Sequence, residues 1–283
     1  MMPNYKDKIV MLKEYFEKNQ NILMAFIFGS YAKGDQNPES DIDVVVYFTP
    51  TGKKIEWEED KTYGNENIIW NDIEKITGIK TDFIVLNRAP ANLVFSIIEN
   101  GIPVVIKDSA YFLRFFLCIS SAAEDFRKFI NDFWKIKQRS ASLSEIDKSR
   151  LIYLVDFLKT ELDDFPIFKN IIDKEYQTDS YKRRNVERWV ENIVNSSIDI
   201  AKVLLASEGR RLPQTYRLIL NDLSYLEEFD GDIAIKLSTH SKLRNILAHE
   251  YMDIRFNQIK DFLVEPDKTY QYLIDYVKKL ISK

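Results

Sequence analysis

The sequence predicts an α+β protein, in which a small N-terminal α/β domain with a mixed sheet precedes an all-α helical bundle. Up to Ile106, short apolar runs rich in β-branched and aromatic residues alternate with stretches of helical periodicity. Beyond it, long helical patterns follow one another, and only two of the eight glycines lie there. We therefore expect domains at residues 1–108 and 145–283, joined by a connecting helix at 109–144.

The first domain is expected to hold four strands and several helices. Runs bounded by turn-forming residues predict strands at 22–28, 44–48, 82–86 and 104–106, and apolar spacing predicts helices at 5–18, 67–77 and 89–99. Gly78 is a typical helix stop. The acidic, irregular stretch 55–66 is expected to be a surface excursion.

Helical periodicity dominates the rest of the chain. It predicts helices at 111–138, 145–163, 180–207, 214–228, 232–250 and 256–282, with a break at Glu265-Pro266. Ser142 and Glu145 have the spacing of a capping box at the start of the second of these helices.

Composition limits the class of protein. The 283 residues are 45% hydrophobic and 30% charged, which is typical of a soluble globular chain. A net charge of −4 gives no general signal for nucleic acid, so RNA would need a local basic patch. The single cysteine, Cys118, excludes an internal disulfide framework and favours a reducing, cytoplasmic location. We expect no membrane span and no export signal, because no apolar run is long enough.

Asp41 and Asp43 form the first candidate site. Being two residues apart at the start of a predicted strand, they should project from the same face, where their like charges call for a cation such as Mg²⁺. Asp82 opens a separate strand and supplies a third carboxylate. Three acids suit two divalent cations that activate an attacking oxygen and stabilise leaving pyrophosphate. Gly29-Ser30 offers a close backbone approach and a hydroxyl for a phosphate.

The residues from Gly29 to Gly34, followed by Ser40 to Asp43 before an apolar strand, resemble the signature of the nucleotidyltransferase superfamily, in particular its minimal, MNT-type branch. Residues 81–86 resemble the segment that carries the family's third carboxylate, and the resemblance spans about 5–107. It implies binding of a nucleoside triphosphate and Mg²⁺ and transfer of a nucleoside monophosphate to a hydroxyl, and we expect ATP as the substrate. Lys33 is a candidate for contacting phosphate, with a solvated turn lysine as the alternative.

His249 marks a second candidate site near the end of a predicted helix. Arg244, Asn245 and Tyr251 lie close to it in the sequence, but at 100° per residue Arg244 and His249 are about 140° apart. Only the length of arginine, a helix distortion or a second copy of the helix would bring them together. His249 is suited to acid–base work at a ribose hydroxyl, and Arg244 to stabilising phosphate charge, without a metal.

The pattern Arg-Asn-x-x-x-His-x-Tyr resembles the HEPN ribonucleases, specifically HepT-like toxins, over roughly residues 145–283. Matches also occur at 147–153, 191–200 and 213–217. This resemblance implies a homodimer formed through the HEPN domain, with RNA as a possible partner. In the paired MNT antitoxins, the transferase attaches AMP to the tyrosine of the motif, which corresponds by position to Tyr251. Here both parts lie in one chain.

Two other functions remain open at this point. One is transfer of a nucleotide to an external small molecule, as in aminoglycoside-modifying enzymes, although that chemistry gives no reason for the Arg–His motif. The other is a non-catalytic, nucleotide-sensing dimer that binds RNA. Two basic clusters, Lys182-Arg183-Arg184 and Arg210-Arg211 with Arg217, form either an RNA-binding edge or an ordinary solvated surface.

Overall fold

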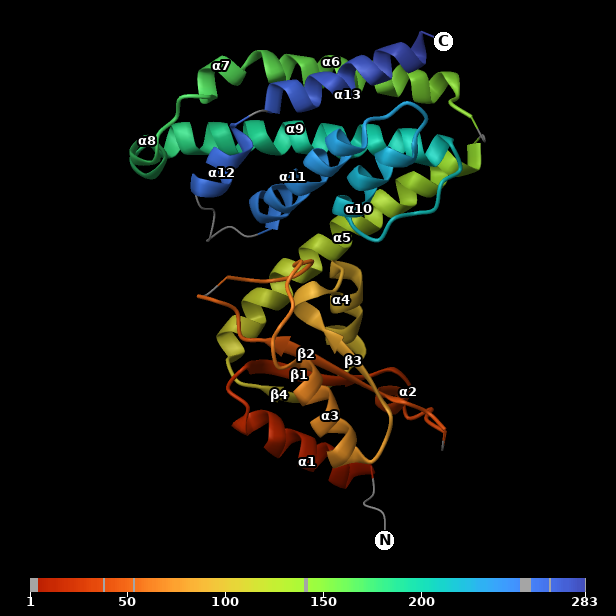
Figure 1. Cartoon of the computed structure of the whole chain (residues 1–283), viewed down its shortest axis with the longest axis vertical. Coiled ribbons are helices and arrows are strands. Elements are labelled where there is room, and N and C mark those ends of the chain that lie inside the picture. The colour runs from red at the N-terminus through yellow and green to blue at the C-terminus, as the bar shows by residue number, and fades with distance from the viewer. Residues whose placement is uncertain are drawn as a thin grey trace. The chain divides into compact units, whose positions relative to one another are not determined.

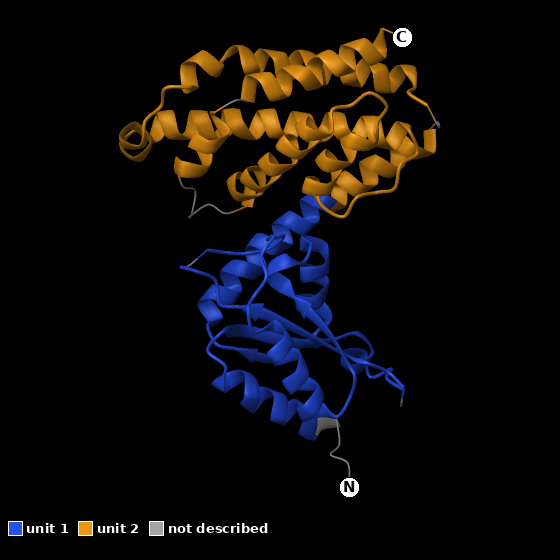
Figure 2. Cartoon of the chain, viewed as in Figure 1, with its two compact units in different colours: residues 1–126 blue, residues 127–283 orange. Residues whose placement is uncertain are grey.

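The computed structural model describes residues 5–37, 39–52, 54–139, 142–249, 256–264 and 266–282. The chain separates into two compact units, residues 1–126 and 127–283, which Figure 2 colours differently. Helix α5, Ser109–Arg139, begins in the first unit and ends in the second.

The first unit contains a four-stranded sheet, and helices occur in the chain segments that connect its strands (Figure 1). Its order is β3-β2-β1-β4, with β1 antiparallel to both neighbours and β2 parallel to β3, so the predicted mixed sheet is confirmed. Gly78 ends α3 in the left-handed conformation, as its position in the sequence predicts. The elements are α1 (Tyr5–Lys18), β1 (Ile22–Phe28), α2 (Gly29–Lys33), β2 (Ile42–Phe48), α3 (Glu66–Thr77), β3 (Thr81–Val85), the 3₁₀ turn η1 (Leu86–Arg88), α4 (Ala91–Asn100) and β4 (Ile102–Ile106).

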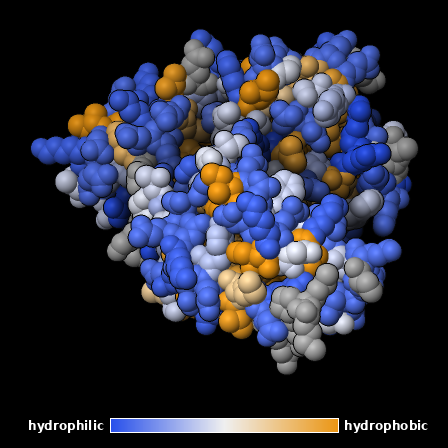
Figure 3. All heavy atoms as spheres, turned by 60° about the horizontal axis from the view of Figure 1, so that its bottom comes forward, coloured by the Kyte–Doolittle hydropathy of each residue, from blue (hydrophilic) through white to orange (hydrophobic). Residues whose placement is uncertain are grey.

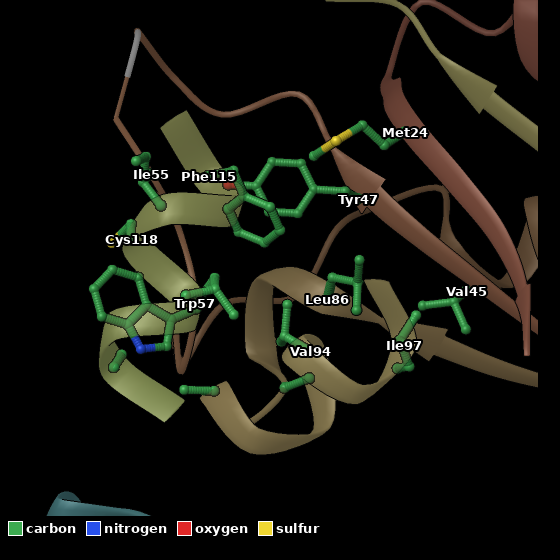
Figure 4. Packing of buried hydrophobic residues seen from close by; sticks show 14 of the residues in the cluster. Met24, Val45, Tyr47, Ile55, Trp57, Leu86, Val94, Ile97, Phe115 and Cys118 are labelled. Atoms are coloured by element: carbon green, nitrogen blue, oxygen red, sulfur yellow. The ribbon is translucent and has the colours of Figure 1, made fainter. Parts of the chain in front are cut away.

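Helices cover both faces of this sheet, because alternate side chains of β2 point to opposite sides. Val44 and Val46 pack with α1 and α3, whereas Val45 and Tyr47 pack with α4 and the first half of α5. Figure 4 shows the second of these clusters, in which Phe115 and Cys118 of α5 take part. The burial of Cys118 agrees with its apolar sequence setting.

The stretch 55–66 differs from the surface excursion that its acidic composition predicts. Ile55 and Trp57 are buried in the cluster of Figure 4. Glu56 is also buried, and it accepts hydrogen bonds from Tyr63 (2.7 Å) and Asn87 (3.0 Å). The prediction was wrong for residues 55–57, because paired polar groups make an acidic segment compatible with burial.

The second unit is helical, and α9 is its central helix, in contact with α6, α8, α10, α11 and α12. The elements after α5 are α6 (Glu145–Asp163), α7 (Phe165–Phe168), α8 (Asp173–Thr178), α9 (Ser180–Ser207), α10 (Tyr216–Asn221), the 3₁₀ turn η2 (Asp222–Tyr225), α11 (Gly231–His249), α12 (Phe256–Phe262) and α13 (Pro266–Ile281). The sequence therefore predicts the α+β class correctly.

Several local expectations for this unit need correction. The helix expected over 214–228 is only α10, because Thr215 caps its start by accepting from the amide of Leu218 and the chain then continues as the η2 turn. The helices α7 and α8 were not predicted. Ser144, not Ser142, caps α6, because Ser144 directly precedes the helix and its hydroxyl accepts from the amide of Asp147.

An ionic cluster around the buried Lys202 joins three helices of the second unit. Lys202 of α9 is 5% exposed and contacts Asp132 of α5 at 2.7 Å and Asp199 of its own helix at 2.6 Å. Arg150 of α6 also binds Asp132, at 2.7 Å. Burial alone would raise the pKa of Asp132, but the hydrogen bonds from Arg150 and Lys202 outweigh it and lower this pKa to about 2.

Apolar side chains cluster little on the face that Figure 3 shows. Figure 3 displays a mainly hydrophilic face with apolar side chains in small, scattered groups, which is ordinary for a folded chain. Among the described helices, none combines the length and apolar character needed to cross a membrane.

We expect Asp132→Asn to lower the free energy of unfolding by about 1–2 kcal/mol at pH 7. This is less than the loss from breaking a fully buried ion pair, because the Asp132 carboxylate is partly exposed. Because the pKa of Asp132 is lower in the folded chain than its ordinary 3.8, the carboxylate stabilises the fold above that pH and loses this effect as the pH falls toward 2. In urea unfolding, the free energy of unfolding should therefore differ less between the wild type and Asp132→Asn at pH 3 than at pH 7.

Glu145→Gln is the matched control for Asp132→Asn. It removes a carboxylate that is 87% exposed and pairs with Lys148 across one helical turn, so it should change stability by less than about 0.5 kcal/mol. Equal effects of the two substitutions would contradict a stabilising role for the ionic cluster around Lys202.

Candidate functional site

The three predicted carboxylates gather at one edge of the sheet. Asp43 of β2 lies opposite Asp82 of β3 in the parallel register, and alternation along the strands puts both side chains on the same face. Asp41 immediately precedes β2. The pKa of Asp43 is raised by its burial first, and then by the negative charges of Asp82 and Asp41. The three acids are therefore close enough to repel one another.

Gly29 lies against this group because β1 pairs antiparallel with β2, with Phe28 opposite Asp43. A Cβ atom at residue 29 would be 2.0 Å from Oδ2 of Asp43, and the φ angle of Gly29 is +68°. Both facts require glycine here. The turn after β1 thus brings bare backbone directly beside the Asp43 carboxylate.

The short helix α2 continues from this glycine. Ser30 is half-buried next to Gly29, whereas Lys33 is exposed in the last turn of α2. The buried Tyr31 donates a hydrogen bond to the carbonyl of Ser40 (3.4 Å), which links α2 to the residue before Asp41. The sequence did not predict this hydrogen bond, because a single tyrosine in a turn does not indicate its partner.

Lys80 is a further residue that the sequence reasoning missed. Its Nζ atom lies 2.8 Å from Oδ2 of Asp41, and this hydrogen bond is the main cause of the raised pKa of Lys80. The carbonyl of Lys80 accepts from the amide of Ile42, so the two chain segments lie side by side. Within the described part of the chain, no three acidic, histidine or cysteine side chains form a ready-made metal site.

Arg244 and His249 do meet within one chain. Nη1 of Arg244 lies 3.0 Å from Nε2 of His249, and their exposed fractions are 8% and 7%. Of the routes that helical geometry left open, the length of the arginine side chain is the one observed. Asn245 is also buried.

Side chains of α9 and α10, outside the motif, also hold Arg244. Its Nε donates to Oδ1 of Asn195 on α9 (2.9 Å), and its guanidinium lies 4.7 Å from the ring centre of Tyr216, the first residue of α10. Sequence reasoning missed both, because they are 49 and 28 residues from Arg244 and no local pattern connects them.

Tyr251, the remaining predicted residue of this motif, lies outside the described residues. The other histidine, His240, has a structural setting: its Nδ1 atom is 2.9 Å from the hydroxyl of Tyr270, and burial lowers the pKa of His240 to about 4.

The predicted basic edge is partly neutralised by local ion pairs. Lys182 binds Glu175 at 2.6 Å, and Arg210 binds Glu208 at 3.0 Å. These ion pairs are exposed. RNA binding by the two basic clusters stays a prediction.

Comparison with known proteins follows the two units. Residues 11–110 match the family described as polymerase beta, nucleotidyltransferase, and residues 156–280 match the family described as ribonuclease HepT-like. Over 75 residues the chain is 35% identical to a putative protein adenylyltransferase of Methanocaldococcus jannaschii, covering 26% of this chain and 77% of that protein. The chain belongs to the nucleotidyltransferase family. It is a nucleotidyltransferase fused to a HepT-like domain, so both family resemblances seen in the sequence are confirmed.

Solved structures overlap this fused nucleotidyltransferase only weakly. A toxin–antitoxin crystallised with AMP-PNP is 19% identical, with a TM-score of 0.35 over 46% of this chain and 98% of that chain. A mutant of a toxin–antitoxin named MntA-HpeT is 16% identical, with a TM-score of 0.34 and the same coverage. Overlap at these scores has no weight for function.

We expect Gly29→Ala to displace the Asp43 carboxylate, because the new Cβ would overlap Oδ2. Gly34→Ala is the matched control: Gly34 has a φ of +79° but no atom within 4 Å of an added Cβ. Both variants bear a left-handed backbone cost of about 1–2 kcal/mol. Thermal melting should show a clearly larger loss for Gly29→Ala, and equal losses would contradict the contact with Asp43.

Proposed function

We propose that this protein transfers AMP from ATP to a protein hydroxyl in an Mg²⁺-dependent reaction. The observation that carries the proposal is the crowding of Asp41, Asp43 and Asp82 beside the bare backbone of Gly29. The name of the archaeal relative, a putative protein adenylyltransferase, supports this class of acceptor.

The donor set suits a hard divalent cation, because carboxylate oxygens are the ligands that Mg²⁺ prefers and the like charges lack sufficient compensation. Asp43 and Asp82 would hold the cation, and Asp41 would join them after leaving Lys80. When bound, Mg²⁺ supplies charge stabilisation at the phosphates. The fit therefore requires one side-chain exchange, from the Asp41–Lys80 pair to the metal.

The protein residues have distinct roles in this proposal. Gly29, Ser30 and Lys33 bind the triphosphate of ATP. Asp82 accepts the proton of the attacking hydroxyl, whose oxygen bonds to the α-phosphorus while the bond to the β-phosphate oxygen breaks and pyrophosphate leaves. Asp41 and Asp43 would hold the cation, which would supply charge stabilisation at the reacting phosphate.

The proposed acceptor is Tyr251, two residues after His249. AMP on this tyrosine would place a negative charge and a bulky base next to the Arg244–His249 pair, where both would hinder an RNA phosphate. The proposal extends to the second unit, in which His249 serves as general acid or base and Arg244 stabilises the phosphate in a metal-independent ribonuclease. A homodimer formed through the HepT-like domain would complete the nuclease.

We expect ATP and Mg²⁺ to increase the mass of the purified protein by one or more AMP units. Asp41→Ala with Asp43→Ala should abolish this increase, because the cation would lose its ligands, and Tyr251→Phe should abolish it by removing the acceptor. Intact-mass spectrometry measures both. Undiminished labelling of the double variant would contradict the transferase proposal. Labelling that is lost in the double variant but persists in Tyr251→Phe would reject Tyr251 as the acceptor.

We also expect His249→Ala to lose RNA cleavage by roughly 10²-fold or more, because the acid–base group is gone. His240→Gln is the control, since His240 is the other histidine and lies in a structural setting. Cleavage should fall in the wild type after treatment with ATP and Mg²⁺ but not in Tyr251→Phe. Equal digestion by wild type and His249→Ala would remove the nuclease from the proposal.

A further inference from the structure

The guanidinium of Arg244 is held on three sides within the second unit. Its Nε atom donates to Asn195 of α9, its Nη1 atom lies 3.0 Å from Nε2 of His249, and its plane lies over the ring of Tyr216. Arg244 is 8% exposed. A buried guanidinium with such partners is fixed in orientation, since its donors form a rigid planar fork.

The contact with Arg244 limits the hydrogen-bonding role of Nε2 of His249. Arginine has only donors and stays charged in proteins, so Nε2 of His249 must be the acceptor of this hydrogen bond. With Nε2 as the acceptor, the tautomer that fits this contact carries its proton on Nδ1. An imidazolium would place a donor against a donor and one positive charge against another.

Asn195 fixes the direction in which the guanidinium of Arg244 points. Its Oδ1 atom binds Nε, which lies at the base of the guanidinium, so this bond fixes the rotation that directs Nη1 at His249. The contact with the Tyr216 ring fixes the plane of the guanidinium but permits rotation within that plane. Asn195 comes from α9, which packs against α11, so the restraint is independent of the helix that carries Arg244 and His249.

We propose that Asn195 is a positioning residue that holds Arg244 against Nε2 of His249 and so maintains this histidine as the neutral Nδ1–H tautomer. In the nuclease proposed above, on which this consequence rests, the lone pair of Nε2 is occupied until a phosphate draws Arg244 away. The same rotation that releases Nε2 would bring Nη1 to the phosphate. Asn195 thus couples substrate binding to exposure of the base.

The chain offers a matched control on the same helix. Asn192 is half-buried, like Asn195, and makes one side-chain hydrogen bond to a charged residue, Glu161 (3.0 Å). That bond leads to α6 instead of Arg244. Asn192→Ala therefore removes an amide of the same kind from the same helix without loosening the guanidinium.

The direct test is nitrogen NMR of the full chain labelled at histidine, which gives signals from only two side chains, His240 and His249. His249→Gln assigns them. In the wild type and in Asn192→Ala, we expect His249 to show a protonated Nδ1 and an unprotonated Nε2. Asn195→Ala should lose this preference and give averaged or mixed tautomers, while Asn195→Asp, which keeps the acceptor oxygen, should retain it.

The second readout is RNA cleavage, in which Asn195→Ala should fall roughly 10- to 100-fold, as expected for a misplaced catalytic group, and Asn192→Ala should not. A proton on Nε2 in the wild type, or an unchanged His249 spectrum in Asn195→Ala, overturns the inference. The spectra need no activity: a wild type that cleaves no RNA but shows the expected tautomers would refute the nuclease and leave the positioning role intact.

Discussion

The parallel pairing of β2 with β3 is the constraint on which the N-terminal site depends. It places Asp43 opposite Asp82, although the two are 39 residues apart in the chain. A parallel pair needs a crossover, which α3 provides, and Gly78 lets the chain leave that helix and return to the sheet. Because helices bury both faces, a slip of one residue in the register would exchange the side chains that pack in the two clusters. The core therefore enforces a crowding of like charges that would not persist by itself.

Crowded carboxylates need compensation, and the fold provides it only in part. Lys80 pairs with Asp41, whereas the raised pKa of Asp43 shows that its burial and its acidic neighbours are not balanced. A group in this condition is a candidate ligand for the cation that we propose. The second unit handles charge differently, since Lys202 and Arg150 neutralise Asp132 within the same cluster. Residual charge is thus found at the proposed transfer site, while the helical bundle uses paired charges for packing.

A single chain that carries a transferase and a HepT-like domain holds them at a fixed ratio. Selective loss of one protein, which would free the other in a two-chain system, cannot occur here. In our proposal, control passes to the chemical state of the nuclease motif, with AMP on Tyr251 as the off state. In our proposal the buried Arg244–His249 contact adds a second level, because Nη1 of Arg244 and Nε2 of His249 are paired with each other.

The sequence by itself determined much of this protein. Periodicity and turn residues located the strands and most helices, including α6 and α9, and the motifs around Asp41 and His249 identified both families. It failed where distant contacts outweigh local composition, as in the acidic stretch around Glu56, which is buried through its partners Tyr63 and Asn87.

Only the tertiary structure decided which residues complete the sites. Lys80 reaches Asp41, and Asn195 reaches Arg244, through packing between segments far apart in the chain. Helical angles alone separated Arg244 from His249, and the long arginine side chain, fixed by α9, overcame that separation. The physical reason is common to these cases: local sequence sets backbone direction, whereas the partner of a charged side chain is set by which elements the core brings together.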